Sequence, residues 1–408
     1  MTDPVTILQV VPRLETGGSE QSAVEIAEAL IRAGSRAIVV TEGGRLAKAV
    51  TRAGGEIVTL PVASKNPATM LANARRLAKL VTERNVAILH ARSRAPAWSA
   101  LLAARWTGRP LVTTYHGAYG KPGPVKAIYN SVMGRGSRVI ANSLYTAGLV
   151  ASRQPEAKDR LRVIYRGIDG EIFDPFVVPP GPVARLRESW GVEPETKIVL
   201  LAARLSGIKG QRHTIEAARL LSEEGALEGA VVILVGDGRE GYRKELSDLI
   251  ARYGLEEKAK LVGHCGDMPV AFLAAHTALV PSLVAETFGR TSIEAQAMGC
   301  PVIVSNMGAL PETIVAYEED ATGFTGWLVP PEDAAALAAR IKIALGLTPE
   351  QRAAIGERAR QRVSRQFDLA QMQSKTLAVY DELLGTRLAE LFEHPPLYAA
   401  AEGVEGNA

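Results

Sequence analysis

The sequence predicts an α/β protein with two doubly wound parallel sheets, on the strength of three observations. First, short β-rich runs alternate with amphipathic helical stretches along the chain, which indicates right-handed crossovers between parallel strands. Second, a proline-rich interval, DPFVVPPGP at 174–182, interrupts the alternation, which then starts again. Third, 408 residues exceed what one hydrophobic core usually holds, so two domains are expected.

The elements follow in chain order. Seven candidate strands precede the interruption: Thr6–Val11, Ala37–Thr41, Glu56–Leu60, Val86–His90, Leu111–Tyr115, Arg138–Ala141 and Arg162–Ile164. Between them lie helical patterns such as Ser22–Arg32, Thr69–Arg84 and Ala97–Trp106. Five candidate strands follow it: Ile198–Ala202, Val231–Val235, Lys260–Val262, Ala278–Val280 and Pro301–Val304. From Pro331 onward the pattern is helical, through Gln351–Arg365 and Leu369–Leu384, and residues 393–408 are expected to fray.

Doubly wound sheets bind ligands outside the carboxyl ends of their strands. Two such domains joined by a hinge therefore predict a central cleft between these ends.

Composition excludes several classes of protein. Apolar residues make up 47% and charged residues 22%, as in ordinary globular proteins. Cys265 and Cys300 have neither a metal-binding nor a redox spacing, which favours a reducing compartment. The start, MTDPVTILQVV, is typical of a first strand rather than a signal peptide, and no apolar stretch approaches the roughly 20 residues of a membrane helix. We expect a cytoplasmic protein whose membrane contact, if any, is peripheral.

The net charge of +3 hides an asymmetry. Residues 1–175 carry 24 Lys/Arg against 13 Asp/Glu, a net +11, and the remainder carries 23 against 31, a net −8. No acidic residue lies between Glu83 and Glu156, an interval that contains Arg84, Arg92, Arg94, Arg105, Arg109, Lys121, Lys126, Arg135, Arg138 and Arg153. Two interpretations stay open: an incidentally basic surface, or a face for an anionic acceptor or bilayer, where each basic residue adds about 1 kcal/mol. No binding motif supports nucleic acid as a partner.

The stretch AETFGRTSIEAQAMG, from Ala285 to Gly299, holds two glutamates that need an explanation. A helix is predicted after Phe288, with Glu286 just before it and Glu294 about two turns inside. Eight positions at about 1.5 Å each separate the carboxylates by roughly 12 Å, too far for a shared proton or one metal ion. Between them lies a helix start, whose free N–H groups attract phosphate. This arrangement suits a sugar, a diphosphate and a ribose.

Two loops of the first half follow predicted strands. Gly17-Gly18 precede a helix, where glycine lets a ligand approach backbone N–H groups, although such a pair taken alone is more often purely structural. His116 follows strand Leu111–Tyr115 directly and is placed to bond a sugar hydroxyl. A capped, structural histidine remains the alternative.

Three loops of the second half also follow the carboxyl ends of predicted strands. Arg204 and Lys209 follow a buried strand in a glycine-containing loop and offer a planar fork and a mobile charge. These two cations suit a diphosphate, and a pair of solvated surface charges is the less favoured alternative. Gly236 and the pair Gly263-His264 end the next two strands, where backbone groups can read a nucleobase edge. His264 and His276 lack carboxylate or thiol neighbours at chelating spacing other than the adjacent Cys265, so no metal site is predicted. No Ser-His-Asp order or nucleophile elbow is present either.

Assembled in order, these motifs resemble family 4 of the glycosyltransferases, retaining enzymes with the GT-B architecture of two Rossmann-like domains that face a central cleft. The resemblance covers roughly residues 5–385 and is most specific in the glutamate pair together with the Arg/Lys pair. The motifs that carry it are Gly17-Gly18, His116-Gly117, Arg166-Gly167-Ile168-Asp169, Arg204 with Lys209-Gly210, Glu286 with Glu294, Gly308-Ala309-Leu310-Pro311-Glu312 and Gly326-Trp327-Leu328-Val329.

The resemblance implies a role for each matching residue. Glu286 would hold hydroxyls of the transferred sugar, and Glu294 the ribose. Arg204 and Lys209 would neutralise the leaving diphosphate, and His116 would face the donor sugar, which makes His116, Arg204, Lys209 and Glu286 the catalytic set. The donor would contact Gly17, Gly18, Arg204, Lys209, Gly236, Gly263, His264, Glu286, Phe288, Gly289, Arg290 and Glu294, with Gly18 admitting the diphosphate and Phe288 and Gly289 offering backbone N–H groups. Many relatives carry an apolar residue in place of Arg290.

The resemblance also implies a division of the chain. Residues 1–173 would form the acceptor-binding domain, 174–182 the linker and 183–368 the nucleotide-sugar-binding domain. Residues 369–392 would form a helix that crosses back to the N-terminal domain, and 393–408 a flexible tail.

The implied activity is retaining, metal-independent transfer of a hexose from a UDP- or GDP-linked donor, with no further cofactor. The acceptor would be an anionic envelope glycolipid or saccharide of the lipopolysaccharide-core type, because RSRAPAWSA at 92–100 is similar to that group and the basic stretch lies in the acceptor-binding domain. Peripheral contact with the inner membrane at its cytoplasmic face would follow.

Two other functions remain open. A GT-B nucleotide-sugar epimerase needs acid/base carboxylates in the cleft, which the spacing of Glu286 and Glu294 disfavours. A non-catalytic sugar-nucleotide-binding protein has little need for the leaving-group stabilisation that Arg204 and Lys209 offer.

Overall fold

The structure, a computed structural model, describes residues 4–15, 17–117 and 123–395. The chain divides into two compact units, an N-terminal unit (Met1–Gly167 with Ala370–Ala408) and a C-terminal unit (Ile168–Leu369). The proline-rich interval at 174–182 lies inside the C-terminal unit, where helix α7 (Pro180–Ser189) begins.

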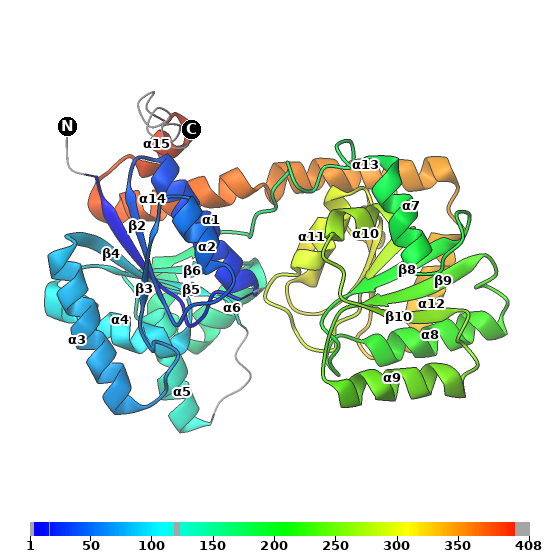
Figure 1. The fold of residues 1–408 in the computed structure, drawn as a ribbon, viewed down its shortest axis with the longest axis horizontal. Helices are drawn as coiled ribbons and strands as arrows, with labels where there is room; N and C mark the ends of the chain where they lie inside the picture. The colour runs from blue at the N-terminus through cyan, green and yellow to red at the C-terminus, as the bar shows by residue number, and fades with distance from the viewer. Residues whose placement is uncertain (1–3, 16, 118–122, 396–408) are drawn as a thin grey trace, which may run out of the picture. The chain divides into compact units, whose positions relative to one another are not determined.

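The N-terminal unit contains a seven-stranded parallel sheet in the order β3-β2-β1-β4-β5-β6-β7 (Figure 1). Its strands are β1 (Thr6–Val10), β2 (Arg36–Thr41), β3 (Glu56–Thr59), β4 (Val86–Ala91), β5 (Leu111–Tyr115), β6 (Arg138–Ala141) and β7 (Leu161–Val163). Its helices are α1 (Gly18–Arg32), α2 (Ala47–Arg52), α3 (Pro67–Glu83), α4 (Arg94–Thr107), α5 (Pro124–Ser131), α6 (Leu144–Arg153), α14 (Leu369–Leu384) and α15 (Leu388–Glu393), with short 3₁₀ helices η1 (Val132–Gly134) and η2 (Pro155–Arg160).

The C-terminal unit contains a six-stranded parallel sheet in the order β10-β9-β8-β11-β12-β13 (Figure 1). Its strands are β8 (Lys197–Ala202), β9 (Ala230–Val235), β10 (Ala259–Gly263), β11 (Thr277–Val280), β12 (Val302–Ser305) and β13 (Gly326–Val329). Besides α7, its helices are α8 (Gln211–Glu223), α9 (Glu240–Arg252), α10 (Met268–Ala274), α11 (Arg290–Ala297), the 3₁₀ helix η3 (Leu310–Thr313), α12 (Ala334–Leu345) and α13 (Pro349–Gln366).

The prediction of two doubly wound parallel sheets is confirmed, and the predicted strands agree with the observed ones within one or two residues at each end. Strands β1 and β9 are buried along their whole length, as strands covered by helices on both faces must be. Strand β13 was not predicted as a strand. It is only four residues long, and it buries Trp327 almost completely.

Helix α14 supplies part of the core of the N-terminal unit. Its Tyr380 is fully buried, and the Tyr380 hydroxyl lies 2.6 Å from Nδ1 of His90. The other ring nitrogen of His90 lies 2.7 Å from the Thr114 hydroxyl. A second side chain of α14, Gln373, donates to the carbonyl of Glu25 at 2.7 Å. The unit is therefore completed by residues that lie more than 200 positions after its last strand.

Burial makes the folded protein sensitive to acid. It lowers the pKa of His90 well below 6.5, with a smaller effect from the Arg92 charge, and it lowers the pKa of His276 to about 4. These rings are neutral in the folded protein, whereas the unfolded chain binds their protons near pH 6.5. The free energy of unfolding is therefore expected to fall as the pH drops below about 6.5, by up to about 1.4 kcal/mol per pH unit for each ring.

Urea midpoints at pH 7.0 and pH 5.0 measure this dependence. Replacing His90 with glutamine is expected to reduce the difference between the two midpoints. The same change at the exposed His394 serves as the control. Equal pH dependence in the wild type and both variants would contradict the assignment.

Across the described ranges, no helix is long and apolar enough to cross a membrane.

Candidate functional site

Glu286 is the centre of a polar cluster in the C-terminal unit. Its Oε1 accepts a hydrogen bond from Nζ of Lys209 at 2.6 Å and a second from the hydroxyl of the buried Ser282. The Glu286 side chain is 19% exposed and that of Lys209 is 28% exposed, so both face solvent only partly. The sequence-predicted residues Lys209 and Glu286 are thus in direct contact, although they are 77 positions apart in the chain.

The loop 308–312 supports the backbone of Glu286. Gly308 has a φ of 66°, and a Cβ there would lie 2.5 Å from the carbonyl oxygen of Glu286. Ala309 donates its N–H to the same carbonyl at 2.9 Å. A Cβ on Gly289, whose φ is 111°, would lie 2.5 Å from the Leu310 side chain. Both glycines are needed for this close packing.

Helix α11 starts at Arg290, with Gly289 as its N-cap and without a side-chain cap. Because Gly289 has no side chain that could accept a hydrogen bond, it caps none of the N–H groups in the first turn of this helix. An anion site at a helix start requires N–H groups that the N-cap side chain does not occupy. Phe288 is 3% exposed and packs edge-on against Phe367, with ring centroids 5.7 Å apart. The Phe288 side chain thus belongs to the core, which leaves only its backbone for a ligand.

Glu294 lies closer to the helix start than predicted. It is the fifth residue of α11, one turn inside rather than two, and the helix starts at Arg290, directly after the left-handed Gly289. Nε of Arg290 donates to Oε1 of Glu294 at 3.0 Å. The residue that departs from the family pattern therefore orients one of the two predicted carboxylates.

Backbone hydrogen bonds tie the loops after β8, β9, β10 and β11 together. Leu205 donates to Asp237 at 2.8 Å, and Gly236 donates to Gly263 at 2.7 Å. Leu283 donates to Ile208 at 2.9 Å, which joins the Lys209 loop to the Glu286 loop. The glycines are conformationally required here too, since Gly236 has a φ of 137° and Gly263 one of 76°.

Arg204 and His264 are exposed side chains at the ends of β8 and β10. Neither forms a hydrogen bond or an ion pair with Glu286 in the part of the chain that the structure describes, so the structure brings their loops together but not their side chains. Beside Arg204, the Ser206 hydroxyl is buried and has no hydrogen-bond partner among the described residues. A buried, unsatisfied hydroxyl at a strand's carboxyl end is a further polar group available to a ligand.

A second cluster forms in the N-terminal unit around Arg166. Its Nη2 lies 2.6 Å from Nδ1 of His116, and its Nη1 lies 3.5 Å from the hydroxyl of Ser22. A Cβ on Gly18 would lie 2.5 Å from Nη1 of Arg166, so glycine at this position makes room for the guanidinium. Three separate sequence motifs, Gly17-Gly18, His116-Gly117 and Arg166-Gly167, thus meet at one side chain.

The contact with Arg166 determines which ring nitrogen of His116 carries the proton. A guanidinium only donates hydrogen bonds, so Nδ1 of His116 is the acceptor and the neutral ring carries its proton on Nε2. Burial, followed by the charges of Arg166, Arg92 and His90, lowers the pKa of His116 well below 6.5. His116 is therefore a neutral group that donates through Nε2.

The backbone N–H of Gly17 is less available to a ligand than the sequence predicts. This N–H donates to the carboxylate of Glu20 at 2.8 Å, an interaction within the first turn of α1. A phosphate could use this N–H only by displacing Glu20.

The basic stretch between Glu83 and Glu156 is not one free surface, which corrects part of the charge argument. Arg92 is 3% exposed, its Nε donates to Gln9 at 2.8 Å, and burial lowers its pKa to about 10. Arg94 donates to Asn130, and Arg138 forms a 2.8 Å ion pair with Glu382 of α14. Of the residues proposed for bilayer contact, Lys126 is exposed and Lys121 lies outside the described residues.

Sequence reasoning missed two contributors. Ser282 donates a hydrogen bond to the same Glu286 oxygen as Lys209. The only sequence signal for this contact is the position of Ser282 four residues before Glu286. Arg166 was part of a quoted motif without a role, because its partners are about 50 and 150 residues away in the chain. No group of three or more His, Cys, Asp or Glu side chains suited to a metal ion is found among the described residues.

Comparisons with known proteins agree with this architecture. The family model described as glycosyl transferases group 1 matches residues 183–362, and the model of glycosyltransferase family 4 matches residues 16–171. The crystal structure of a glycosyltransferase from Rickettsia africae is 33% identical, covers 94% of this chain and 99% of its own, and has a TM-score of 0.84. Anabaena Alr3699/HepE, solved with UDP and glucose, shares the fold at 24% identity and a TM-score of 0.79 over 93% of this chain and 100% of its own.

A curated relative, the D-inositol 3-phosphate glycosyltransferase of Saccharomonospora viridis, is 29% identical over 263 residues, which are 62% of this chain and 57% of the relative. The chain thus spans a little over half the length of such curated relatives. The two family matches in series, the double-sheet fold and the full-length likeness to the Rickettsia enzyme establish one conclusion. The chain belongs to family 4 of the glycosyltransferases and has the GT-B fold.

Proposed function

We propose that the protein is a retaining, metal-independent hexosyltransferase that moves a sugar from a nucleoside diphosphate to an anionic saccharide or glycolipid. The observation that carries the proposal is the contact of Lys209 with Glu286 beside the start of α11. A cation, a carboxylate and a helix start with N–H groups provide separate partners for a diphosphate and for sugar hydroxyls.

The residues divide the work of the reaction. When the bond between the anomeric carbon and the β-phosphate oxygen breaks, negative charge develops on that phosphate. Lys209, Arg204 and the backbone N–H groups of Phe288 and Gly289 would stabilise it. The acceptor hydroxyl forms the new bond on the same face of the sugar and passes its proton to the departing phosphate.

Glu286 and His116 are assigned to sugar hydroxyls rather than to covalent chemistry. The Glu286 carboxylate already accepts from Lys209 and Ser282, which holds it in place as a hydrogen-bond acceptor. His116, neutral and protonated on Nε2, is suited to donate to a sugar oxygen. Glu294, oriented by Arg290, is assigned to the ribose.

The acceptor is proposed to be anionic because basic residues predominate in the first 175 residues, and the name of the Saccharomonospora relative includes a phosphorylated acceptor. We include peripheral contact with the cytoplasmic face of the inner membrane in this proposal. UDP-glucose is the first donor to test, since the Anabaena neighbour was solved with UDP and glucose.

Nucleotide release from a panel of UDP-, GDP- and ADP-sugars tests the proposal, with EDTA present and a membrane extract as the acceptor. The expected result is release from one donor that depends on the extract and persists in EDTA. Donor binding without release by any extract would favour the non-catalytic binding protein, and a changed sugar without transfer would favour the epimerase.

A further inference from the structure

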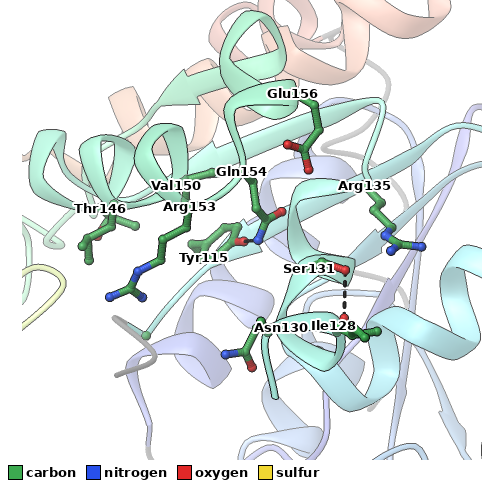
Figure 2. A pocket seen from close by; sticks show the side chains of 13 residues that line it. Tyr115, Ile128, Asn130, Ser131, Arg135, Thr146, Val150, Arg153, Gln154 and Glu156 are labelled. Atoms are coloured by element: carbon green, nitrogen blue, oxygen red, sulfur yellow. Dashed lines mark hydrogen bonds between the residues drawn. The ribbon is translucent and has the colours of Figure 1, made fainter. Parts of the chain in front are cut away.

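A groove with a volume of about 450 Å³ lies in the N-terminal unit between α5 and α6, outside the residues assigned to the donor (Figure 2). Its central walls are apolar and are formed by Ala127 and Ile128 of α5 and by Leu149 and Val150 of α6. Polar groups line its ends. This volume and this lining are typical of sites that hold small ligands.

The groove runs across the height of the sheet and begins at the predicted reaction edge. Gly117, which lines one end, follows His116 directly at the carboxyl end of β5, and Thr146 lies in the first turn of α6 at the same edge. Arg135, which lines the other end, precedes β6 and so lies at the amino edge. The ten residues of α6, which forms one wall of the groove, span about 15 Å at 1.5 Å per residue.

Helix α5 leaves its apolar side chains largely uncovered. Val125 is 81% exposed and Ile128 is 64% exposed, and Leu144 at the start of α6 is 60% exposed. Single exposed apolar residues are ordinary, but Ile128 lines the groove, and Val125 and Leu144 belong to the two helices that form it, which indicates a surface that binds an apolar ligand.

The charge around the groove specifies the head of that ligand. Arg153 lines the groove, and Figure 2 shows its side chain running back from the end of α6 toward Thr146, that is, toward the reaction edge. Glu156 lines the groove as well, but η2, to which it belongs, follows the end of α6 at the amino edge. Arg153 therefore favours a negative group on the side of Thr146, whereas Arg135 and Glu156 carry opposite charges at the far end.

Gln154 adds a polar group to the lining, beside Tyr115. Gln154, 8% exposed, donates to the Tyr115 hydroxyl at 2.7 Å. Its Oε1 has no hydrogen-bond partner among the described residues and lies against Gly134, where a Cβ would collide with it. A ligand that is apolar along its middle can end or leave the groove at the amino edge beside Arg135.

We propose that the groove between α5 and α6 binds the hydrocarbon chain of an amphipathic acceptor, whose anionic head lies beside Arg153. This inference rests on the proposed transferase function and narrows its acceptor to a molecule with an alkyl or prenyl chain and a phosphate or carboxylate head. The head is thereby held next to His116, where the sugar arrives, and the chain extends away from the reaction edge.

Fluorescence of 11-dansylaminoundecanoic acid, displaced by dodecyl phosphate, tests the site in the full-length protein. Ala127→Trp places a large side chain in the groove and is expected to weaken both probes at least about tenfold. The control is Ala184→Trp, also an exposed helical alanine, which lines a separate apolar hollow of about 680 Å³ beside α7 and should leave binding unchanged. Equal affinity in the wild type and Ala127→Trp would overturn the proposal.

The head is tested separately. Arg153→Glu is expected to weaken dodecyl phosphate about tenfold and to leave uncharged dodecanol unchanged. A loss of both probes, or of neither, would overturn the placement of the head. Binding to anionic vesicles without binding of the monomeric probes would overturn the hydrocarbon site in favour of a membrane surface.

These outcomes are distinguishable from a failure of the proposed function. UDP binding, measured by calorimetry, and nucleotide release with a chain-free saccharide acceptor do not involve the groove. They are expected to be unchanged in Ala127→Trp, whereas release with the membrane extract should fall. Probe binding without any donor turnover would support the hydrocarbon site and contradict the proposed transferase function.

Discussion

Replacing Lys209 with alanine is expected to lower the turnover number about 10²- to 10³-fold, as removal of one preorganised group that stabilises a transition-state charge does elsewhere. Lys209 holds its ammonium 2.6 Å from Glu286 in a loop fixed to the Glu286 loop by the bond from Leu283 to Ile208. The alanine variant removes the charge that meets the leaving diphosphate. It also leaves the partly buried Glu286 carboxylate with Ser282 as its remaining hydrogen-bond partner among the described residues.

Steady-state kinetics with saturating donor measure the effect, and Lys258→Ala is the matched control. The Lys258 side chain is also 28% exposed and also pairs with a glutamate, Glu228, at 3.5 Å, but it lies in the loop before β10, away from the carboxyl ends of the strands. It should keep wild-type turnover. If both variants lose the same small amount, Lys209 contributes packing rather than catalysis.

Replacing Arg166 with glutamine is expected to have the second largest effect, a loss of about 10² in kcat/KM, as misplacement of a catalytic group by about 1 Å can cause. Arg166 is a positioning residue, since it contacts His116 and the Gly18 turn rather than the donor in the proposed arrangement. Without it, His116 loses both the partner that fixes its proton on Nε2 and the nearest charge that lowers its pKa.

The pH profile separates this role from a structural one. In the wild type the lowered pKa keeps His116 neutral above and somewhat below pH 6.5, so its protonation should not limit the rate there. In the glutamine variant burial still lowers the pKa, but loss of the Arg166 charge raises it part of the way back, so an acidic limb should develop at a higher pH than in the wild type. Arg162→Gln, which breaks a more exposed ion pair with Glu382, should change neither rate nor profile. A slower variant with an unchanged profile would mean that Arg166 only supports the fold.

Much of the fold could be predicted because alternation between β-rich runs and helical periods is local information. Strand β13 was missed since a run of four residues, Gly326–Val329, carries too little of that signal. The depth of Glu294 in α11 was misjudged for a different reason. The helix starts at Arg290, one residue later than predicted, and the eight positions from Glu286 to Glu294 include four that precede this start.

The site was predicted at the level of residue types but not of partners. Lys209 and Glu286 were both named, yet their contact depends on loops that the β8–β11 order brings together. The basic stretch was overestimated because charges were counted along the chain. Arg92 proved to be buried against Gln9, and Arg138 is neutralised by Glu382, more than 240 residues away.

The return of α14 to the N-terminal unit has a consequence for synthesis. Domains generally fold in the order in which they leave the ribosome. Here the C-terminal unit is continuous and is complete once Leu369 has been made, whereas His90 and the surrounding core wait for Tyr380. The half that is translated first is therefore the last to be finished, and during that interval it is the nascent chain's most exposed target for chaperones and proteases.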